Sequence, residues 1–308
     1  MTADLTNPIF TDEAKAREWL EARRWPNGPV CPHCGAPDER VRKMVGVEDK
    51  DGRERQGLYQ CNQCHGQFTV TVGTLYERSH IPLHKWLLAT HLLTSSKKGI
   101  SAHQLHRMLG ITYKSAWFMA HRIREGMTTT DSGPMGEGGG TVEAYETYIG
   151  RKPGRKKQRG AGHKMAVMSL VERNGTVRSF HITDFDGKTL SDILEKNVSL
   201  DAHLRTDEAP TYGQYGHHFA SHETVNHGRE EYVRGDASTN TIEGYFSIFK
   251  RGMKGVYQHC GEKHLQRYLN EFDFRYSNRS ALGVDDAERT ERAVKGIEGK
   301  RLTYRPSH

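Results

Sequence analysis

Apolar positions between residues 79 and 127 repeat at the three- and four-residue spacing of amphipathic helices. Ser79 can cap the first of these helices, with Pro82 in its first turn. Further on, Gly110 supplies a turn and Thr112 can cap a following helix. A helix, a glycine-containing turn and a capped helix form a helix-turn-helix pattern, although any small helical hairpin can produce it as well.

Beyond residue 140 the pattern changes to apolar strands that alternate with helices. Strands are predicted at 141–150, 164–172, 176–182 and 202–206, and helices at 188–197, 241–250 and 262–276. The dipeptide Asn174-Gly175 predicts a hairpin between the second and third strands. Hairpin strands followed by helix–strand alternation predict a mixed α/β or α+β layer fold.

The cysteines indicate a metal site in the N-terminal part of the chain. Four of the five cysteines form two CxxC pairs, Cys31 with Cys34 and Cys61 with Cys64. Four thiolates at this double spacing suit tetrahedral Zn²⁺, and short apolar alternations around the second pair predict strands. We therefore expect a zinc ribbon with structural zinc. A redox-active pair is the alternative, which two matched pairs in one short segment make less attractive.

Hydropathy and the N-terminal residues bear on the compartment. No apolar run approaches the roughly 20 residues that span a bilayer. The segment MTADLTNPIF lacks the basic and then apolar order of a secretory signal. We expect a cytoplasmic protein without a membrane partner.

Positive charge is concentrated in one loop. Lys and Arg number 45 against 38 Asp and Glu, which gives a formal net charge of +7. An excess of this size is common, but one short stretch holds Arg151, Lys152, Arg155, Lys156, Lys157 and Arg159. This basic loop is either an ordinary solvated loop or a segment that follows DNA phosphates.

The helix-turn-helix pattern offers a second DNA contact. If this segment binds double-stranded DNA, the start of its second helix would enter the major groove. Tyr113, Lys114 and Ser115 would then lie near base edges or phosphates.

Acidic residues suggest a catalytic site in the C-terminal part. Asp207 ends a predicted strand, where α/β folds tend to carry functional groups. One face of the 241–250 helix would present Asn240, Glu243, Ser247 and Lys250. Two carboxylates and a lysine suit phosphoryl transfer assisted by Mg²⁺, which prefers carboxylate, water and phosphate oxygens. An ordinary amphipathic surface helix is the alternative interpretation.

Longer stretches resemble the Merlin-like DDE transposases of bacterial insertion sequences. The most specific run extends from Glu230 to Cys260, and the segments 263–276, 77–87 and 110–119 are also similar. The resemblance covers the chain from about Trp25 to Arg279. It implies a zinc ribbon, a helix-turn-helix and a ribonuclease-H-like catalytic domain. It also implies Mg²⁺-dependent cleavage at terminal inverted repeats and strand transfer into target DNA, by a homo-oligomer assembled on DNA.

With this resemblance the chain is expected to contain six segments. They are an N-terminal helical segment (1–26), a zinc ribbon (27–76), a helix-turn-helix (77–128), a linker (129–140), a ribonuclease-H-like DDE-type domain (141–280) and a C-terminal tail (281–308). The expected fold class is α/β (α+β), with a mixed sheet and flanking helices.

The resemblance also assigns roles by position. Asp207 matches the second metal-binding aspartate, Asn240 and Glu243 match an Asn/Glu pair that replaces the third acid, and Lys250 matches a trailing lysine. Asp207 and Glu243 would hold the magnesium. Where the family has its first aspartate, this chain has Tyr145.

Tyr145 is a poor replacement because a phenol with a pKa near 10 binds Mg²⁺ weakly at neutral pH. Glu143 shares the strand face of Tyr145 and is a possible substitute, but it lies two residues away, roughly 6.5–7 Å along the strand. A catalytic carboxylate must be placed within about 0.5 Å, so we do not expect rescue.

Three functions remain open. The first is a transposase with impaired catalysis, and the second is a catalytically inactive DNA-binding protein or repressor derived from one. The third is a zinc-dependent hydrolase that uses His217, His218, His222 and His227. The third is disfavoured because no HExxH-like spacing is present.

Overall fold

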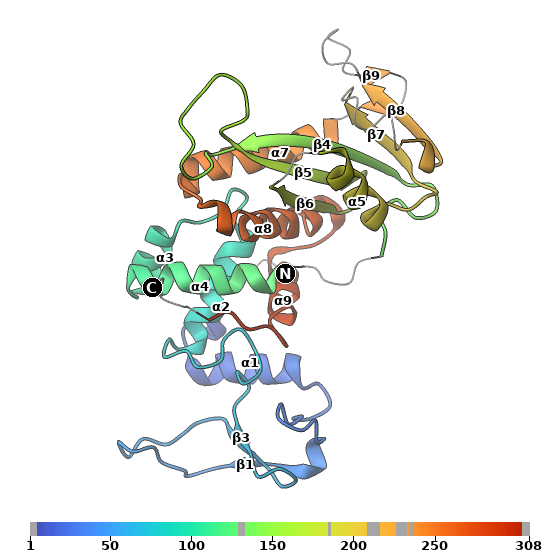
Figure 1. Cartoon of the computed structure of the whole chain (residues 1–308). Helices are drawn as coiled ribbons and strands as arrows, with labels where there is room; N and C mark the ends of the chain where they lie inside the picture. Colours follow the sequence, from blue (N-terminus) through green and yellow to red (C-terminus); the bar gives the residue numbers. More distant parts are fainter. Residues whose placement is uncertain are drawn as a thin grey trace. The chain divides into compact units, whose positions relative to one another are not determined.

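The computed structural model describes residues 5–128, 133–183, 186–207, 216–225, 233–234, 237–238 and 240–303 (Figure 1). The chain forms two compact units. The first unit consists of Met1–Ser95, Ala102–Met127 and Asp285–His308, and the second of Ser96–Ser101 and Thr128–Val284. No helix among the described residues is both long and apolar enough to cross a membrane.

The zinc-ribbon segment of the first unit is a small antiparallel sheet. Its three strands are β1 (Val41–Met44), β2 (Leu58–Cys61) and β3 (Gln67–Phe68), in that order. So small a sheet has little core of its own. Its aromatic side chains compensate in part, because the Tyr59 ring stacks on Phe68 and meets the edge of Trp25.

The rest of the first unit is helical. It contains η1 (Pro8–Phe10), α1 (Glu13–Arg24), α2 (Leu83–Ser95), α3 (Ala102–Leu109), α4 (Tyr113–Gly126) and α9 (Asp286–Lys295). The turn between α3 and α4 contains Gly110 at φ 60°, and the Thr112 hydroxyl accepts a hydrogen bond from Ser115 N at 3.2 Å. The predicted turn and cap of the helix-turn-helix are therefore confirmed.

The start of α2 differs from the expectation. The backbone N–H groups of Leu83 and His84 donate to the two carboxylate oxygens of Glu13, at 3.0 and 3.2 Å. Ser79 does not cap this helix; its hydroxyl accepts from the indole N–H of Trp86 at 2.9 Å. The Glu13 carboxylate, from another helix, satisfies the N–H groups at the start of α2 in the way that a local cap would.

The segment 281–308, expected as a tail, contains a helix. Asp285 caps α9 through Glu288 N at 2.8 Å. The helix lies against α2, where His91 Nδ1 and the Thr290 hydroxyl are 2.9 Å apart and both side chains are buried. The end of the described chain thus completes the core of the first unit.

The second unit is built on a five-stranded sheet in the order β6-β5-β4-β7-β8. The strands are β4 (Thr141–Ile149), β5 (Met165–Glu172), β6 (Val177–Ile182), β7 (His203–Asp207) and β8 (Ser221–Val225). Pairs among β4, β5 and β6 are antiparallel, whereas β4–β7 and β7–β8 are parallel. The predicted hairpin is present, with Asn174 at φ 57°.

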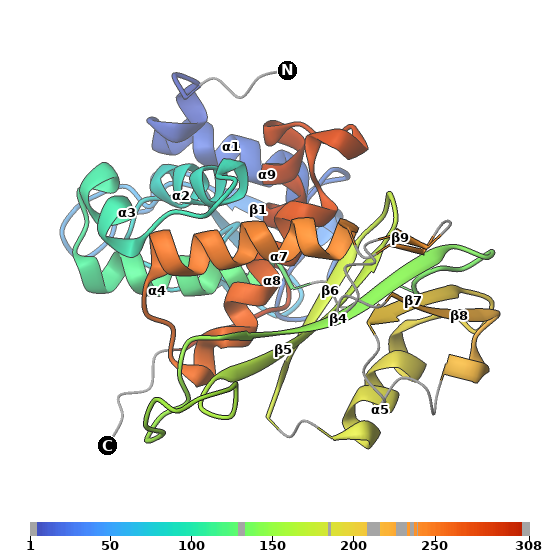
Figure 2. The same cartoon turned by 90° about the horizontal axis from the view of Figure 1, so that it is seen from above.

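Helices cover both faces of this sheet (Figure 2). On one face, α5 (Gly187–Asn197) buries Leu190 and Leu194 against β4 and β5. On the other face lie α7 (Asn240–Gly252), the π-helical turn η5 (Met253–Tyr257) and α8 (Leu265–Ser277). Short β9 (Val233–Arg234) and β10 (Ala237–Ser238) pair with each other. A mixed sheet between helices confirms the expected α/β, ribonuclease-H-like fold class.

A buried polar cluster lies between the sheet and α8. The Asp273 carboxylate accepts hydrogen bonds from the Tyr245 hydroxyl at 2.5 Å, from the Ser179 hydroxyl at 2.7 Å and from Ser179 N at 2.7 Å. Burial raises the pKa of the Asp273 carboxyl to about 7. The cluster joins α7, α8 and β6 through side chains in the apolar layer.

Candidate functional site

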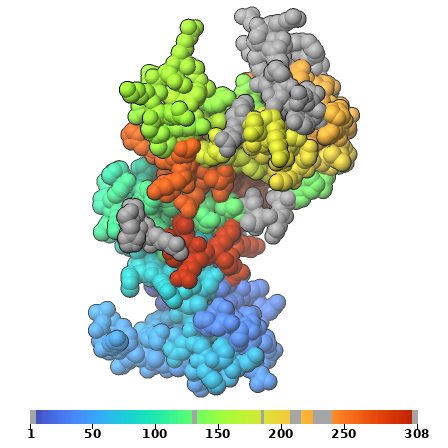
Figure 3. All heavy atoms as spheres, in the orientation of Figure 1, coloured from blue at the N-terminus to red at the C-terminus, as the bar shows by residue number. Residues whose placement is uncertain are grey.

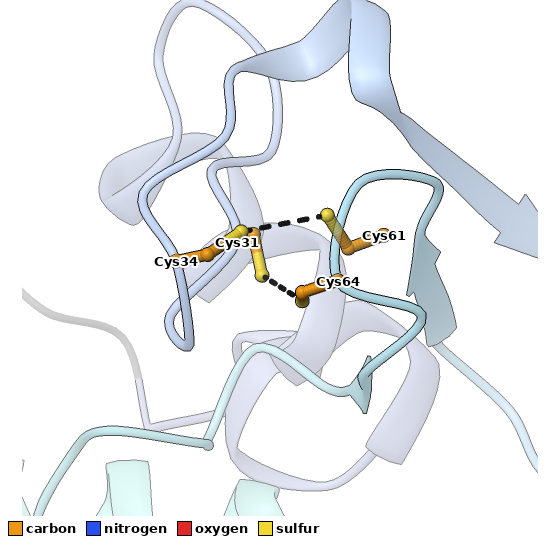
Figure 4. A group of neighbouring side chains, drawn as sticks. All are labelled: Cys31, Cys34, Cys61 and Cys64. Carbon is orange, nitrogen blue, oxygen red and sulfur yellow. Dashed lines mark hydrogen bonds between the residues drawn. The ribbon is translucent and has the colours of Figure 1, made fainter.

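The four paired cysteines gather at one point in the ribbon (Figure 4). The sulfurs of Cys31 and Cys64 are 3.7 Å apart, as are those of Cys34 and Cys61, and all four lie within 4.8 Å of one another. Tetrahedral Zn²⁺ with Zn–S bonds of about 2.3 Å separates its sulfurs by about 3.8 Å. The arrangement therefore fits structural zinc, and within the described ranges no other group of three or more His, Cys, Asp or Glu does so.

Backbone turns bring each cysteine pair together. In the first knuckle, Gly35 N donates to Cys31 O at 2.9 Å and Gly35 adopts φ 75°, which suits a residue without Cβ. In the second, Cys61 N donates to Gly66 O at 3.0 Å. The backbone hydrogen bonds of the two knuckles thus direct all four sulfurs toward one point.

The expected catalytic positions 145 and 207 lie on the neighbouring strands β4 and β7 of the sheet. The parallel register pairs Thr141 with His203 and Glu143 with Arg205. Tyr145 and Asp207 each lie two residues beyond the last pair of this register. Asp207 is the last residue of β7, and its side chain lies outside the described part of the chain.

Tyr145 faces helix α7 from β4. Its ring is partly buried, and the ring centroid lies 6.1 Å from that of Phe246. The phenol thus occupies the strip between the sheet and α7, on the face where a carboxylate at this position would be directed.

Glu143 is held by two structural contacts. Its side chain has no exposed surface, and Oε1 accepts from Arg173 Nε at 2.9 Å. Oε2 accepts from the backbone N–H of Ile242 at 3.0 Å, in the first turn of α7. Both oxygens are engaged, so a move toward a metal at position 145 would break an ion pair and uncap the helix.

The start of α7 carries the remaining acidic candidate. Asn240 and Glu243 are both exposed in the first turn of this helix. Glu243 lies between two residues of α7 that contact β4. Ile242 N donates to Glu143, and the Phe246 ring contacts the ring of Tyr145. Glu243 therefore lies within one helical turn of residues that contact positions 143 and 145 on β4.

Lys250 lies two turns further along α7, beside a pocket that the sequence did not indicate. The pocket has a volume of about 440 Å³ and also contains Lys164 and Lys254. Burial lowers the pKa of Lys250, and the positive charges of Lys254 and Lys164 lower it further. The four-residue spacing of Lys250 and Lys254 in the sequence could have indicated that both lie on one helix face. That Lys164 lies near them could not be predicted, because only the folded sheet brings it there.

The predicted DNA contacts lie at exposed positions in both units. Tyr113 and Lys114 are exposed at the start of α4, whereas Ser115 is partly buried and its backbone N–H donates to the Thr112 hydroxyl. The loop between β4 and β5 projects from the second unit (lime in Figure 3). Its exposed basic residues are Arg151, Arg155, Lys156, Lys157 and Arg159, whereas Lys152 is partly buried and donates to Thr183 O at 3.4 Å.

The histidines do not form a metal group among the described residues. His222 Nε2 lies 2.9 Å from the Thr206 hydroxyl, and burial lowers its pKa. The rings of His217 and His218 contact each other with centroids 4.3 Å apart. His227 lies outside the described residues.

Comparison with known proteins matches both units. A model of transposase zinc-ribbon domains matches residues 11–67, and a model of ISXO2-like transposase domains matches residues 138–277. A protein in the transposable element ISH50 of Halobacterium salinarum is 28% identical in an alignment 285 residues long that covers 86% of this chain and 91% of that protein.

Among solved structures, a chain in the crystal structure of a pre-cleavage Mos1 transpososome aligns with 59% of this chain and 73% of its own length. Its identity is 10% and its TM-score 0.21. The zinc-ribbon match agrees with the cysteine site, and the transposase-domain match covers the mixed sheet. The ISH50 relative extends the similarity over most of the chain. The chain therefore belongs to the IS1595 family of insertion-sequence transposases.

Proposed function

We propose that this transposase binds the terminal repeats of its element through the helix-turn-helix and the basic loop, and that its capacity to cleave DNA is impaired. The observation that carries the proposal is the pair of residues on β4. Tyr145 and Asp207 lie on paired strands, each two residues beyond the last pair, and Glu143 is held by Arg173 and Ile242 N. Asp207 and Glu243 alone are a short donor set for magnesium, which tolerates little geometric error.

In a complete site, bound Mg²⁺ would stabilise charge on the oxygens of the phosphate under attack. Here the chain's own residues can still bind and orient DNA. Lysine and arginine side chains attract phosphates as fixed positive charges, and this binding needs no metal. We therefore expect binding and cleavage to separate experimentally.

The cleavage test compares the chain with Tyr145→Asp on DNA that carries the element's own terminal repeats, in Mg²⁺ and in Mn²⁺. We expect very little cleavage by the unmodified chain and a large gain in the variant. Tyr145→Asn is the matched control, because it removes the same ring but adds no carboxylate, and it should stay inactive.

Strong cleavage by the unmodified chain would refute the proposed impairment. If Glu143→Ala then abolished it, Glu143 would be the replacement ligand despite its structural contacts. Specific binding of the terminal repeats with no cleavage by Tyr145→Asp would favour the alternative, a DNA-binding protein or repressor that has lost catalysis through further changes.

The DNA-binding test concerns the basic loop. Changing Lys156 and Lys157 to Gln should weaken binding to terminal-repeat DNA and flatten the dependence of affinity on salt, by roughly 0.9 in log–log slope per lost phosphate contact. Lys196→Gln, an exposed lysine of α5, should leave the slope unchanged. An equal slope for the double variant and the unmodified chain would remove the loop from the interface.

A further inference from the structure

The pocket beside Lys250 lies at the base of the basic loop. The end of β4, the start of β5 and the end of α7 with its π-helical turn form its walls. Gly150, the last residue before the loop, is part of the lining, as is Lys164 just after the loop. Its volume of about 440 Å³ is within the range of about 300–1,000 Å³ that holds small ligands.

The charge of the pocket favours an anion. Lys250 and Lys254 lie one turn apart on the same helical segment, and Lys164 belongs to the opposite wall. Among the residues that the structure describes, none with a carboxylate belongs to the pocket lining. Like charges held close together repel each other, and the pKa of Lys250 is lowered by burial and, further, by the charges of Lys254 and Lys164. A bound phosphate would offset this repulsion.

The inner surface of the pocket is apolar. Ile149, Met165 and Met253 contribute to the lining, and each is at least nine-tenths buried. A flat or irregular apolar group can pack against methionine, whose side chain adapts to shape. Phosphate alone would leave this surface without a partner, whereas a nucleotide presents both a phosphate and a base.

We propose that this pocket holds one unpaired nucleotide of a DNA strand, with the phosphate among the three lysines and the base against the apolar inner surface. A stacked, paired base inside a duplex cannot enter such a pocket, so the nucleotide is a strand end or one turned out of the helix. This inference deepens the proposed function and rests on it for the source of the nucleotide. The basic loop that continues from the pocket gives the strand a path to it.

The first experiment uses the whole chain of 308 residues without divalent cations and measures binding of dAMP, deoxyadenosine and inorganic phosphate by calorimetry. We expect dAMP to bind more tightly than either part alone. Lys254→Gln and Lys164→Gln should each weaken dAMP binding by about tenfold, as for the loss of one charge-assisted contact. Met253→Ala should weaken dAMP but leave the weaker binding of phosphate unchanged.

Lys196→Gln is the matched control and should bind dAMP normally, because this lysine lies on α5 outside the pocket. Phosphate that binds as tightly as dAMP would overturn the proposal, since the apolar surface would then contribute nothing. Binding of dAMP that survives both pocket lysine variants would also overturn it.

A second experiment distinguishes DNA from free nucleotide. A duplex with a short single-stranded overhang should bind more tightly than a blunt duplex of the same sequence, and Lys254→Gln should remove the difference. An overhang that gives no advantage would overturn the assignment to a DNA strand. Failure of the proposed function appears separately, as no preference for terminal-repeat over unrelated blunt duplex, and this readout is independent of dAMP binding.

Discussion

Glu143 illustrates how one buried charge can organise a site without taking part in its chemistry. A carboxylate without exposed surface is costly unless both oxygens are satisfied. Here Arg173 compensates the charge, and the N–H of Ile242 uses the second oxygen at the positive end of α7. The residue therefore fixes the start of the helix that carries Glu243 relative to β4.

Glu143→Gln should lower the free energy of unfolding by about 1–3 kcal/mol. The amide cannot form the ion pair with Arg173, and its NH₂ group would face either the Arg173 guanidinium or the N–H of Ile242, which are both donors. Urea denaturation would measure this change. Glu243→Gln, at an exposed position on the same helix, should stay within about 0.5 kcal/mol of the unmodified chain. A similar small effect of both variants would contradict the structural role of Glu143.

Asp273 should make stability depend on pH. Its pKa of about 7 lies above the value near 3.9 of an unfolded aspartate, so the folded chain binds this proton more tightly. The contribution of this group to stability is therefore full below pH 4. It falls as pH rises toward 7, by at most about 1.4 kcal/mol per pH unit, and is constant above that range.

Asp273→Asn should remove this component. Unfolding by urea at several pH values between 4 and 8 would then give a flatter profile than the unmodified chain. Asp192→Asn, at an exposed position on α5, should keep the original profile. If Asp273→Asn also kept it, the carboxyl would be ionised in the folded state throughout.

At the scale of elements, local patterns predicted four of the five strands of the large sheet and most helices, because each has its own signal, whereas β8 was not predicted. The β5–β6 hairpin follows from Asn174-Gly175, and α4 begins where Thr112 offers a cap. The cap of α2 could not be predicted, because Glu13 comes from a distant part of the sequence. The Lys164 side of the pocket was missed for the same reason, since only strand pairing brings it near α7.

The zinc ribbon gives an element-scale prediction. Its sheet is short, so the metal should supply most of its folding free energy. Metal analysis should find one zinc per chain after mild purification, none in Cys61→Ser, and one in Cys260→Ser, whose cysteine lies outside the group of four. A chain that retains its ribbon, by NMR or proteolysis, after complete chelation of zinc would contradict this expectation.

At the scale of the whole molecule, the first unit is discontinuous in sequence. Its helical core combines α2 with α9, although the entire sheet of the second unit lies between them in the chain. The contact is polar as well as apolar, because Arg289 donates to Thr94 O at 3.3 Å and Thr290 meets His91. Removal of α9 would leave buried groups of α2 without partners.

A chain that ends at residue 284 should therefore lose the cooperative unfolding of the first unit while the second unit still unfolds as before. Differential scanning calorimetry would detect the lost transition, and a peptide of residues 285–303 added in excess should partly restore it. Two unchanged transitions in the shortened chain would show that α9 is dispensable.

The position of α9 also sets an order of events on the ribosome. Domains form as the chain emerges, beginning at the N-terminus. The second unit is complete once residue 284 has emerged, but the first unit must wait for residues 285–295, although its synthesis began earlier. The unit that carries the helix-turn-helix thus matures after the unit that carries the basic loop, so a translation product interrupted before residue 285 would lack one of the two proposed DNA contacts.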